Sequence, residues 1–215
     1  MYVAIEGVIG VGKTTLARLL QNSFDAEILL EVFEENPFLS DFYSDRERYA
    51  FQTQIFFLLS RYYQQRRTVQ DMLATGRNLL ADYTFAKDAL FARINLKGDE
   101  LDMYYKVHEA LAEKIEKPDL LVYLQASTDT LMQRIALRDR PYERQMERSY
   151  IHELILAYHD FFSKPFDLTP VLTIETDHLN IIQNPEHLSW IENRIRQSLN
   201  MPPFQQTLPL PESSL

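Results

Sequence analysis

Residues 7–15 read Gly-Val-Ile-Gly-Val-Gly-Lys-Thr-Thr and match the phosphate-binding pattern G-x-x-x-x-G-K-[ST]. The apolar run Tyr2–Ile5 before them is typical of a buried strand, and residues 14–24 after them carry leucines at helical spacing. Glycines let the backbone approach an anion closely, and the free amides at the start of the helix point at that anion. The sequence therefore predicts a loop that binds the phosphates of a nucleoside triphosphate.

Individual residues of this loop have defined chemistry. Lys13 is expected to reach the β- and γ-phosphates, and the Thr14 hydroxyl is expected to ligate Mg²⁺. The residues expected to hold the nucleotide are Gly7, Gly10, Gly12, Lys13, Thr14 and Thr15. The alternative is a glycine-rich turn that binds nothing, and the strand and helix that flank the loop argue against it.

The composition limits the class of protein. A chain of 215 residues, 46% hydrophobic and 25% charged, can form one α/β domain with a buried core. Its net charge of −9 argues against nucleic acid or an anionic membrane as the main partner. The absence of cysteine excludes disulfides and thiolate chemistry. Met1 leads directly into the first strand and no apolar run could span a bilayer, so we expect a cytoplasmic location.

Segments typical of strands and helices alternate along the rest of the chain. Further strands are expected at residues 27–31, 78–82, 119–125 and 170–175, and helices at 46–73, 87–93, 100–115, 128–138, 185–199 and from beyond Arg144 to Phe162. Asn36-Pro37 is expected to break regular structure between residues 32 and 43. The alternation predicts an α/β fold with a five-stranded parallel sheet flanked by helices on both faces. We expect one domain over residues 1–200 and a proline-rich tail at 201–215.

Two acids, Glu31 and Asp82, each end an expected strand. Ligands of parallel sheets bind beyond the carboxyl ends of the strands, so these acids could meet near the γ-phosphate. One could accept a hydroxyl proton, and the other could hold Mg²⁺ directly or through water. The alternative is that each acid merely caps a buried strand. The presence of two such acids near a phosphate loop makes this alternative less favoured.

Arg134, Arg138, Arg140 and Arg144 form the densest basic cluster of the chain. Arg134 and Arg138 are four residues apart and share one helix face. Guanidinium groups suit phosphate oxygens, so residues 138–145 are predicted to form a lid over the triphosphate. We expect Arg134 and Arg138 to bind the nucleotide, and Arg138 and Arg140 to act on the transferring phosphate. Solvated arginines near a helix end are the alternative.

Together these residues resemble the deoxynucleoside kinase family, from about Tyr2 to Phe162. The resemblance implies a P-loop kinase fold and transfer of the ATP γ-phosphate, with Mg²⁺, to the 5′-hydroxyl of a deoxynucleoside. Glu31-Val32-Phe33 stands where the family has Glu-Pro-Val, which implies that Glu31 takes the proton of that hydroxyl. Asn36–Leu39 match the Asn-Pro-Phe-Leu of bacterial members. The family also implies a homodimer formed through helices.

The resemblance implies further contacts with the nucleoside. Tyr43 and Glu143 match the family residues that hold the sugar 3′-hydroxyl, and Gln54, Arg61 and Asp88 match those that read the base. A carboxylate at Asp88 accepts hydrogen bonds, so it favours an exocyclic amine over a carbonyl. We therefore expect purine deoxynucleosides or deoxycytidine as substrates, in preference to thymidine.

The chain departs from the family at two places. The acid-Arg-Ser motif is Asp82-Tyr83-Thr84 here, so no arginine follows the acid, and Asn36 replaces the usual tryptophan.

Two other functions stay open. A nucleoside monophosphate kinase of the thymidylate kinase type would need an extra cationic site for the acceptor's phosphate. A non-catalytic relative would use the fold for binding or assembly, and the missing arginine is its only support.

Overall fold

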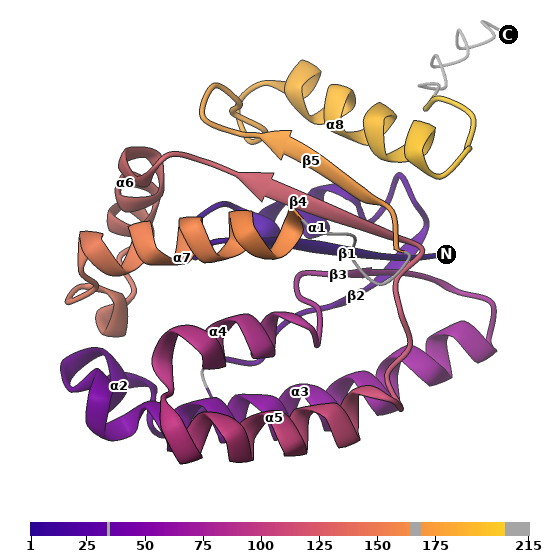
Figure 1. Ribbon diagram of the computed structural model, residues 1–215. Coiled ribbons are helices and arrows are strands. Elements are labelled where there is room, and N and C mark those ends of the chain that lie inside the picture. The colour runs from indigo at the N-terminus through magenta and orange to yellow at the C-terminus, as the bar shows by residue number, and fades with distance from the viewer. Residues whose placement is uncertain (34, 164–168, 205–215) are drawn as a thin grey trace, which may run out of the picture.

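A computed structural model describes residues 1–33, 35–163 and 169–204. It confirms the expected fold class, since five parallel strands form one sheet in the order β2-β3-β1-β4-β5 (Figure 1). The strands are β1 (Tyr2–Gly7), β2 (Ala26–Leu29), β3 (Asn78–Ala81), β4 (Leu120–Gln125) and β5 (Val171–Glu175). β1 lies in the middle of the sheet, which explains why all six of its residues are buried.

Helices cover both faces of the sheet. They are α1 (Lys13–Leu20), α2 (Leu39–Ser44), α3 (Arg46–Ala74), α4 (Lys87–Asn95), α5 (Gly98–Ala112), α6 (Thr128–Arg138), α7 (Arg148–Phe162) and α8 (Pro185–Ser198). In Figure 1, α8 lies on one side of the sheet, and α3 and α5 run side by side on the other. The long helix α3 begins where the Asp45 side chain accepts a hydrogen bond from the Arg48 amide. It ends before Gly76, whose φ of +73° is typical of a residue that terminates a helix.

The phosphate-binding loop leaves the sheet at the carboxyl end of β1. Gly7 has a φ of +147°, and a Cβ atom there would overlap the carbonyl oxygen of Leu124 in β4. Gly12 has a φ of +104° directly before α1. Only glycine adopts such angles without strain, so these two residues let the chain turn from the buried strand into the helix within a few residues.

Several boundaries differ from the sequence-based expectation, among them the end of α1 at Leu20 and that of α5 at Ala112, and three of the differences have a clear local cause. The second strand ends at Leu29, because the Glu31 amide donates to Asp82 Oδ1 at 2.7 Å instead of continuing the ladder. Residues 39–44 form α2, a helix of six residues that is too short to show a clear hydrophobic period. The helix expected beyond Arg144 begins at Arg148, because residues 141–143 first form a 3₁₀ turn led by Pro141.

Within the described ranges, no helix is both long enough and apolar enough to cross a membrane. Most of the proline-rich tail, residues 205–215, lies outside the described residues. Its first part returns to α8, where the Phe204 amide donates to Asn193 Oδ1 at 3.2 Å. The Arg196 guanidinium also lies 5.3 Å from the centroid of the Phe204 ring.

Candidate active site

The phosphate-binding loop and Lys13 form a positively polarised cradle. Lys13 is the first residue of α1, and its Nζ donates to the carbonyl oxygens of Gly7 at 2.6 Å and Val8 at 3.3 Å. Burial, with a smaller contribution from the positive charge of Lys87, lowers the pKa of the Lys13 ammonium to about 8. The free amides of the helix start and this ammonium together suit the phosphates of a nucleotide.

The cradle opens into a cleft that lies between the phosphate-binding loop, α3 and the segment after α6. Its walls contain ten of the side chains expected to form the site, contributed by segments far apart in the chain: Lys13, Thr14, Glu31, Tyr43, Gln54, Arg61, Asp82, Arg138, Arg140 and Glu143. Gly7 and Gly10 line the same cleft. The fold therefore brings most of the sequence-predicted residues to one place.

Thr14 and Asp82 meet beside the phosphate-binding loop. The Thr14 hydroxyl donates to Asp82 Oδ2, while Asp82 Oδ1 accepts the hydrogen bond from the Glu31 amide. A hydroxyl and a carboxylate supply the oxygen ligands that Mg²⁺ prefers, and Mg²⁺ beside nucleotides takes few protein ligands. No group of three or more His, Cys, Asp or Glu in the described part of the chain could hold a metal ion. This pair thus fits an Mg²⁺ ion that shares its coordination with phosphates and water.

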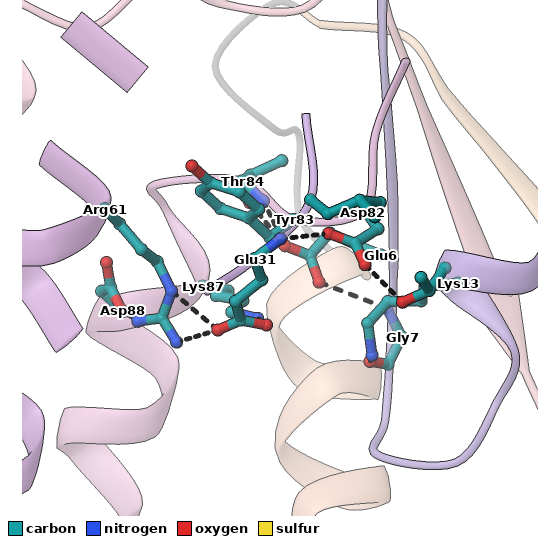
Figure 2. A network of polar contacts seen from close by, with 12 residues as sticks. Glu6, Gly7, Lys13, Glu31, Arg61, Asp82, Tyr83, Thr84, Lys87 and Asp88 are labelled. Carbon is teal, nitrogen blue, oxygen red and sulfur yellow. Dashed lines mark hydrogen bonds and ion pairs between the residues drawn. The ribbon is translucent and has the colours of Figure 1, made fainter. Parts of the chain in front are cut away.

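Glu31 is held by one cation on each carboxylate oxygen (Figure 2). Arg61 of α3 donates to Oε1 through Nη2 and, at 2.9 Å, through Nε, whereas Lys87 of α4 donates to Oε2 at 2.6 Å. Burial favours the neutral carboxyl group, but the attraction and hydrogen bonds of Arg61 and Lys87 outweigh it. The pKa of Glu31 therefore lies well below its ordinary value. Oε1 accepts two hydrogen bonds, whereas Oε2 accepts one from Lys87 and keeps a lone pair that can accept another.

Arg61 also connects Glu31 to the residues expected to read the base. Its Nη1 pairs with Asp88 Oδ1, so a single guanidinium bridges the two acids. Asp88 is fully buried behind the cleft wall, and its Oδ2 has no hydrogen-bond partner among the described residues. Gln54 is buried in the wall itself. Gln54 and Arg61 thus line the cleft while Asp88 lies behind it, and Arg61 is already engaged by both carboxylates.

Tyr43 and Glu143 belong to a wall formed by α2 and the segment after α6. The Tyr43 ring stacks on that of Tyr142, with centroids 6.4 Å apart and an interplanar angle of 11°. Burial raises the pKa of the Tyr43 phenol well above its ordinary value, so the hydroxyl stays protonated. Glu143 is buried and pairs with Arg138 at 2.6 Å and with Arg140 at 3.7 Å. The Arg140 guanidinium also lies over the ring of Phe33, at 4.2 Å from its centroid.

The four arginines of the basic cluster separate into three positions. Arg138 and Arg140 line the main cleft. Arg134 lies behind the loop, where it donates to the carbonyl oxygens of Val11 at 3.1 Å and Thr176 at 2.7 Å. With Gly12 and Thr15 it lines a second hollow, which Arg138 also reaches. The exposed Arg144 instead pairs with Asp139 at 2.7 Å and lines neither hollow.

Two buried charges of this region went unrecognised in the sequence. Glu6 in β1 accepts hydrogen bonds from the Thr84 amide at 2.6 Å, the Thr84 hydroxyl at 2.9 Å and the Tyr158 hydroxyl at 3.2 Å. Glu6 thereby joins β1 to the turn after β3 and to α7. The second of these buried residues is Lys87. An acid inside an apolar strand could have pointed to a role for Glu6, whereas nothing in the sequence near Lys87 pointed to one beyond its place beside Asp88.

A parallel sheet with a phosphate-binding loop at the end of its central strand, and an ionised acid in the same cleft, defines a P-loop kinase. The sequence profile described as "Deoxynucleoside kinase" matches residues 3–200. The chain therefore belongs to the deoxynucleoside kinase family, as its motifs indicated.

Known proteins are similar along nearly the whole chain. Deoxyguanosine kinase of Bacillus subtilis is 35% identical over 199 residues, which cover 91% of this chain and 96% of that protein. Deoxyadenosine kinase of Dictyostelium discoideum is 32% identical over 214 residues, which cover 94% of this chain and 84% of that protein. The fold matches that of deoxyadenosine kinase from M. mycoides, whose structure was solved with the products dCMP and dCDP. The two structures have a TM-score of 0.79 at 24% sequence identity, and the match covers 92% of this chain and 99% of that one. The expected kinase activity on deoxynucleosides is thereby confirmed.

Proposed function

We propose that this kinase transfers the γ-phosphate of ATP to the 5′-hydroxyl of a deoxynucleoside, and that Glu31 takes the proton of that hydroxyl. In this reaction the O–H bond breaks, the hydroxyl oxygen forms a bond to phosphorus, and ADP leaves. The observation that carries the proposal is the position of the Glu31 carboxylate, ionised and held on both oxygens, in the same cleft as the phosphate-binding loop.

The donor side would be bound by the loop amides, Lys13 and the lid arginines. Lys13, Arg138 and Arg140 present cationic donors to the cleft, and such donors stabilise negative charge that develops on a transferring phosphate. Mg²⁺ held by Thr14 and Asp82 would neutralise part of the charge of the phosphates. We keep residues 138–145 as the proposed lid of a single domain that spans residues 1–200.

The acceptor side would be recognised at both ends of the nucleoside. Tyr43, a protonated donor, and Glu143, an acceptor, would hold the sugar 3′-hydroxyl. The Oδ2 of Asp88, which has no hydrogen-bond partner among the described residues, would accept from an exocyclic amine of a base that reaches past the cleft wall, and Gln54 lines the cleft on the way. A carbonyl at that point would leave the buried oxygen unpaired, which is costly. The names of the two relatives, both kinases of purine deoxynucleosides, support the same preference.

The test is turnover of a panel of nucleosides and nucleoside monophosphates with ATP and Mg²⁺, with Lys13→Ala as the blank. We expect deoxyguanosine, deoxyadenosine or deoxycytidine to be phosphorylated at least about 10-fold faster than thymidine, because Asp88 rejects the carbonyl. Faster turnover of monophosphates than of nucleosides would instead favour the thymidylate kinase type. If no compound of the panel were turned over although ATP still bound, the result would favour a non-catalytic relative.

We also infer a homodimer formed through helices. Leu59 and Tyr63 lie four residues apart on α3 and expose 38% and 61% of their surface, and Met103 on α5 exposes 56%. The helices α3 and α5 run side by side (Figure 1). Such apolar surface is typical of a subunit interface. We expect sedimentation of the wild type to give about twice the mass of one chain. The double variant Leu59→Lys/Tyr63→Glu should sediment with the mass of a single chain. A wild-type chain that sediments as a monomer would exclude the dimer.

A cytoplasmic location stays part of the proposal, because ATP and nucleosides are metabolites of the cell interior. Fractionation of cells that express the tagged protein would check it, and recovery with membranes or outside the cell would contradict it.

A further inference from the structure

Lys87, the first residue of α4, carries a buried ammonium group that faces Glu31. Its exposed fraction is 4%, and its Nζ lies 2.6 Å from Glu31 Oε2 (Figure 2). The rings of Tyr83 and Phe91 flank it, with centroids 5.8 and 6.0 Å from Nζ. Within the described ranges, Glu31 is the only carboxylate at ion-pair distance from Lys87. Burying a charge is costly unless it is paired, so the fold commits this ammonium to one carboxylate.

Lys87 and Arg61 hold the Glu31 carboxylate from two sides. Arg61 donates to Oε1, and Lys87 donates to Oε2. Rotation of the carboxyl group would break at least one of these contacts, so together they fix the direction of the lone pair that remains on Oε2. Arg61 is shared with Asp88, whereas Lys87 serves Glu31 alone among the described residues.

Position 83 contributes no charge to this arrangement. Tyr83 directly follows Asp82, but it is fully buried and its hydroxyl donates to Gln64 Oε1 at 2.7 Å. Tyr83 does not line the cleft, whereas Lys87 does, together with Lys13 and Asp82. The second cation on Glu31 therefore comes from α4, and not from the residue that follows the acid.

We propose that Lys87 is a positioning residue for phosphoryl transfer, acting through its contact with Glu31 Oε2. It directs a lone pair of Glu31 at the acceptor hydroxyl, which is a geometric condition for proton transfer. This inference rests on the proposed role of Glu31. The competing explanation is that Lys87 merely neutralises a buried acid and stabilises the fold.

The test compares Lys87→Met with Lys106→Met, which removes the same charge from an exposed position on α5. We expect Lys87→Met to lower kcat for the nucleoside by about 10- to 100-fold, as misplacement of a reacting group does, while the nucleoside Kd changes by less than about 3-fold. Lys106→Met should leave both unchanged. A purely structural role would lower thermal stability but leave the kcat of the folded enzyme unaltered. Should Lys87→Met not fold, Lys87→Gln tests the same expectation.

A double-mutant cycle with Glu31→Gln asks whether Lys87 acts through Glu31. If it does, adding Lys87→Met to Glu31→Gln should lower the residual rate by less than about 2-fold, because the group that it positions is already lost. A full additional loss would overturn the inference, as would a kcat for Lys87→Met within about 2-fold of wild type. If Glu31→Gln is inactive and Lys87→Met has a normal kcat, the proposed role of Lys87 is refuted and that of Glu31 stands. If Glu31→Gln is fully active, the proposed role of Glu31 itself is refuted.

Discussion

Replacement of Glu31 by glutamine is expected to lower kcat by about 100- to 10,000-fold, the range that loss of a general base produces. Glutamine has nearly the same size and can still accept a hydrogen bond from the nucleoside, but it cannot take up the proton. The nucleoside should therefore still bind. Steady-state turnover of the preferred deoxynucleoside measures the first effect, and calorimetric titration with nucleoside measures the second.

Glu35→Gln is the matched control for this substitution. Glu35 lies four residues further along the same segment and is exposed, so its loss removes the same charge without touching the cleft. Its kcat should equal that of the wild type. Because Glu31→Gln also deprives Arg61 and Lys87 of their shared carboxylate, thermal unfolding should be recorded for both variants. Near-normal turnover of a folded Glu31→Gln enzyme would exclude Glu31 as the base.

Lys13→Ala is expected to lower kcat/KM for ATP by about 100- to 1,000-fold, the effect of removing one donor that stabilises developing charge. The Lys13 ammonium lies across the mouth of the phosphate-binding loop, bonded to the carbonyl oxygens of Gly7 and Val8. Its loss removes a charge from the donor side of the cleft and leaves the nucleoside contacts in place. The nucleoside Kd should therefore stay within about 3-fold of wild type.

Lys97→Ala provides the comparison for Lys13, since Lys97 is an exposed lysine between α4 and α5. ATP dependence should be measured at saturating nucleoside, so that the loss can be assigned to the donor side. If Lys13→Ala kept its kcat/KM for ATP while Glu31→Gln was inactive, the triphosphate would have to bind somewhere other than the phosphate-binding loop.

Much of the candidate site was predictable because its signals are local. The glycines and lysine of residues 7–15 specify a strand, a tight turn and a helix within a dozen positions, whatever surrounds them. Glu31 and Asp82 follow recognisable strands, and parallel strands present such residues at one edge. The boundaries that were missed lie where this local signal is short, as in the six-residue helix α2.

The sequence by itself thus determined the fold class, the phosphate-binding loop and the two acids, because each depends on neighbouring residues. The tertiary structure decided what surrounds Glu31. Arg61 is 30 positions from it and Lys87 is 56 positions from it, and they meet because α3 and α4 pack against each other. Ion pairs between such distant residues follow from packing and strand order, to which no local pattern gives access.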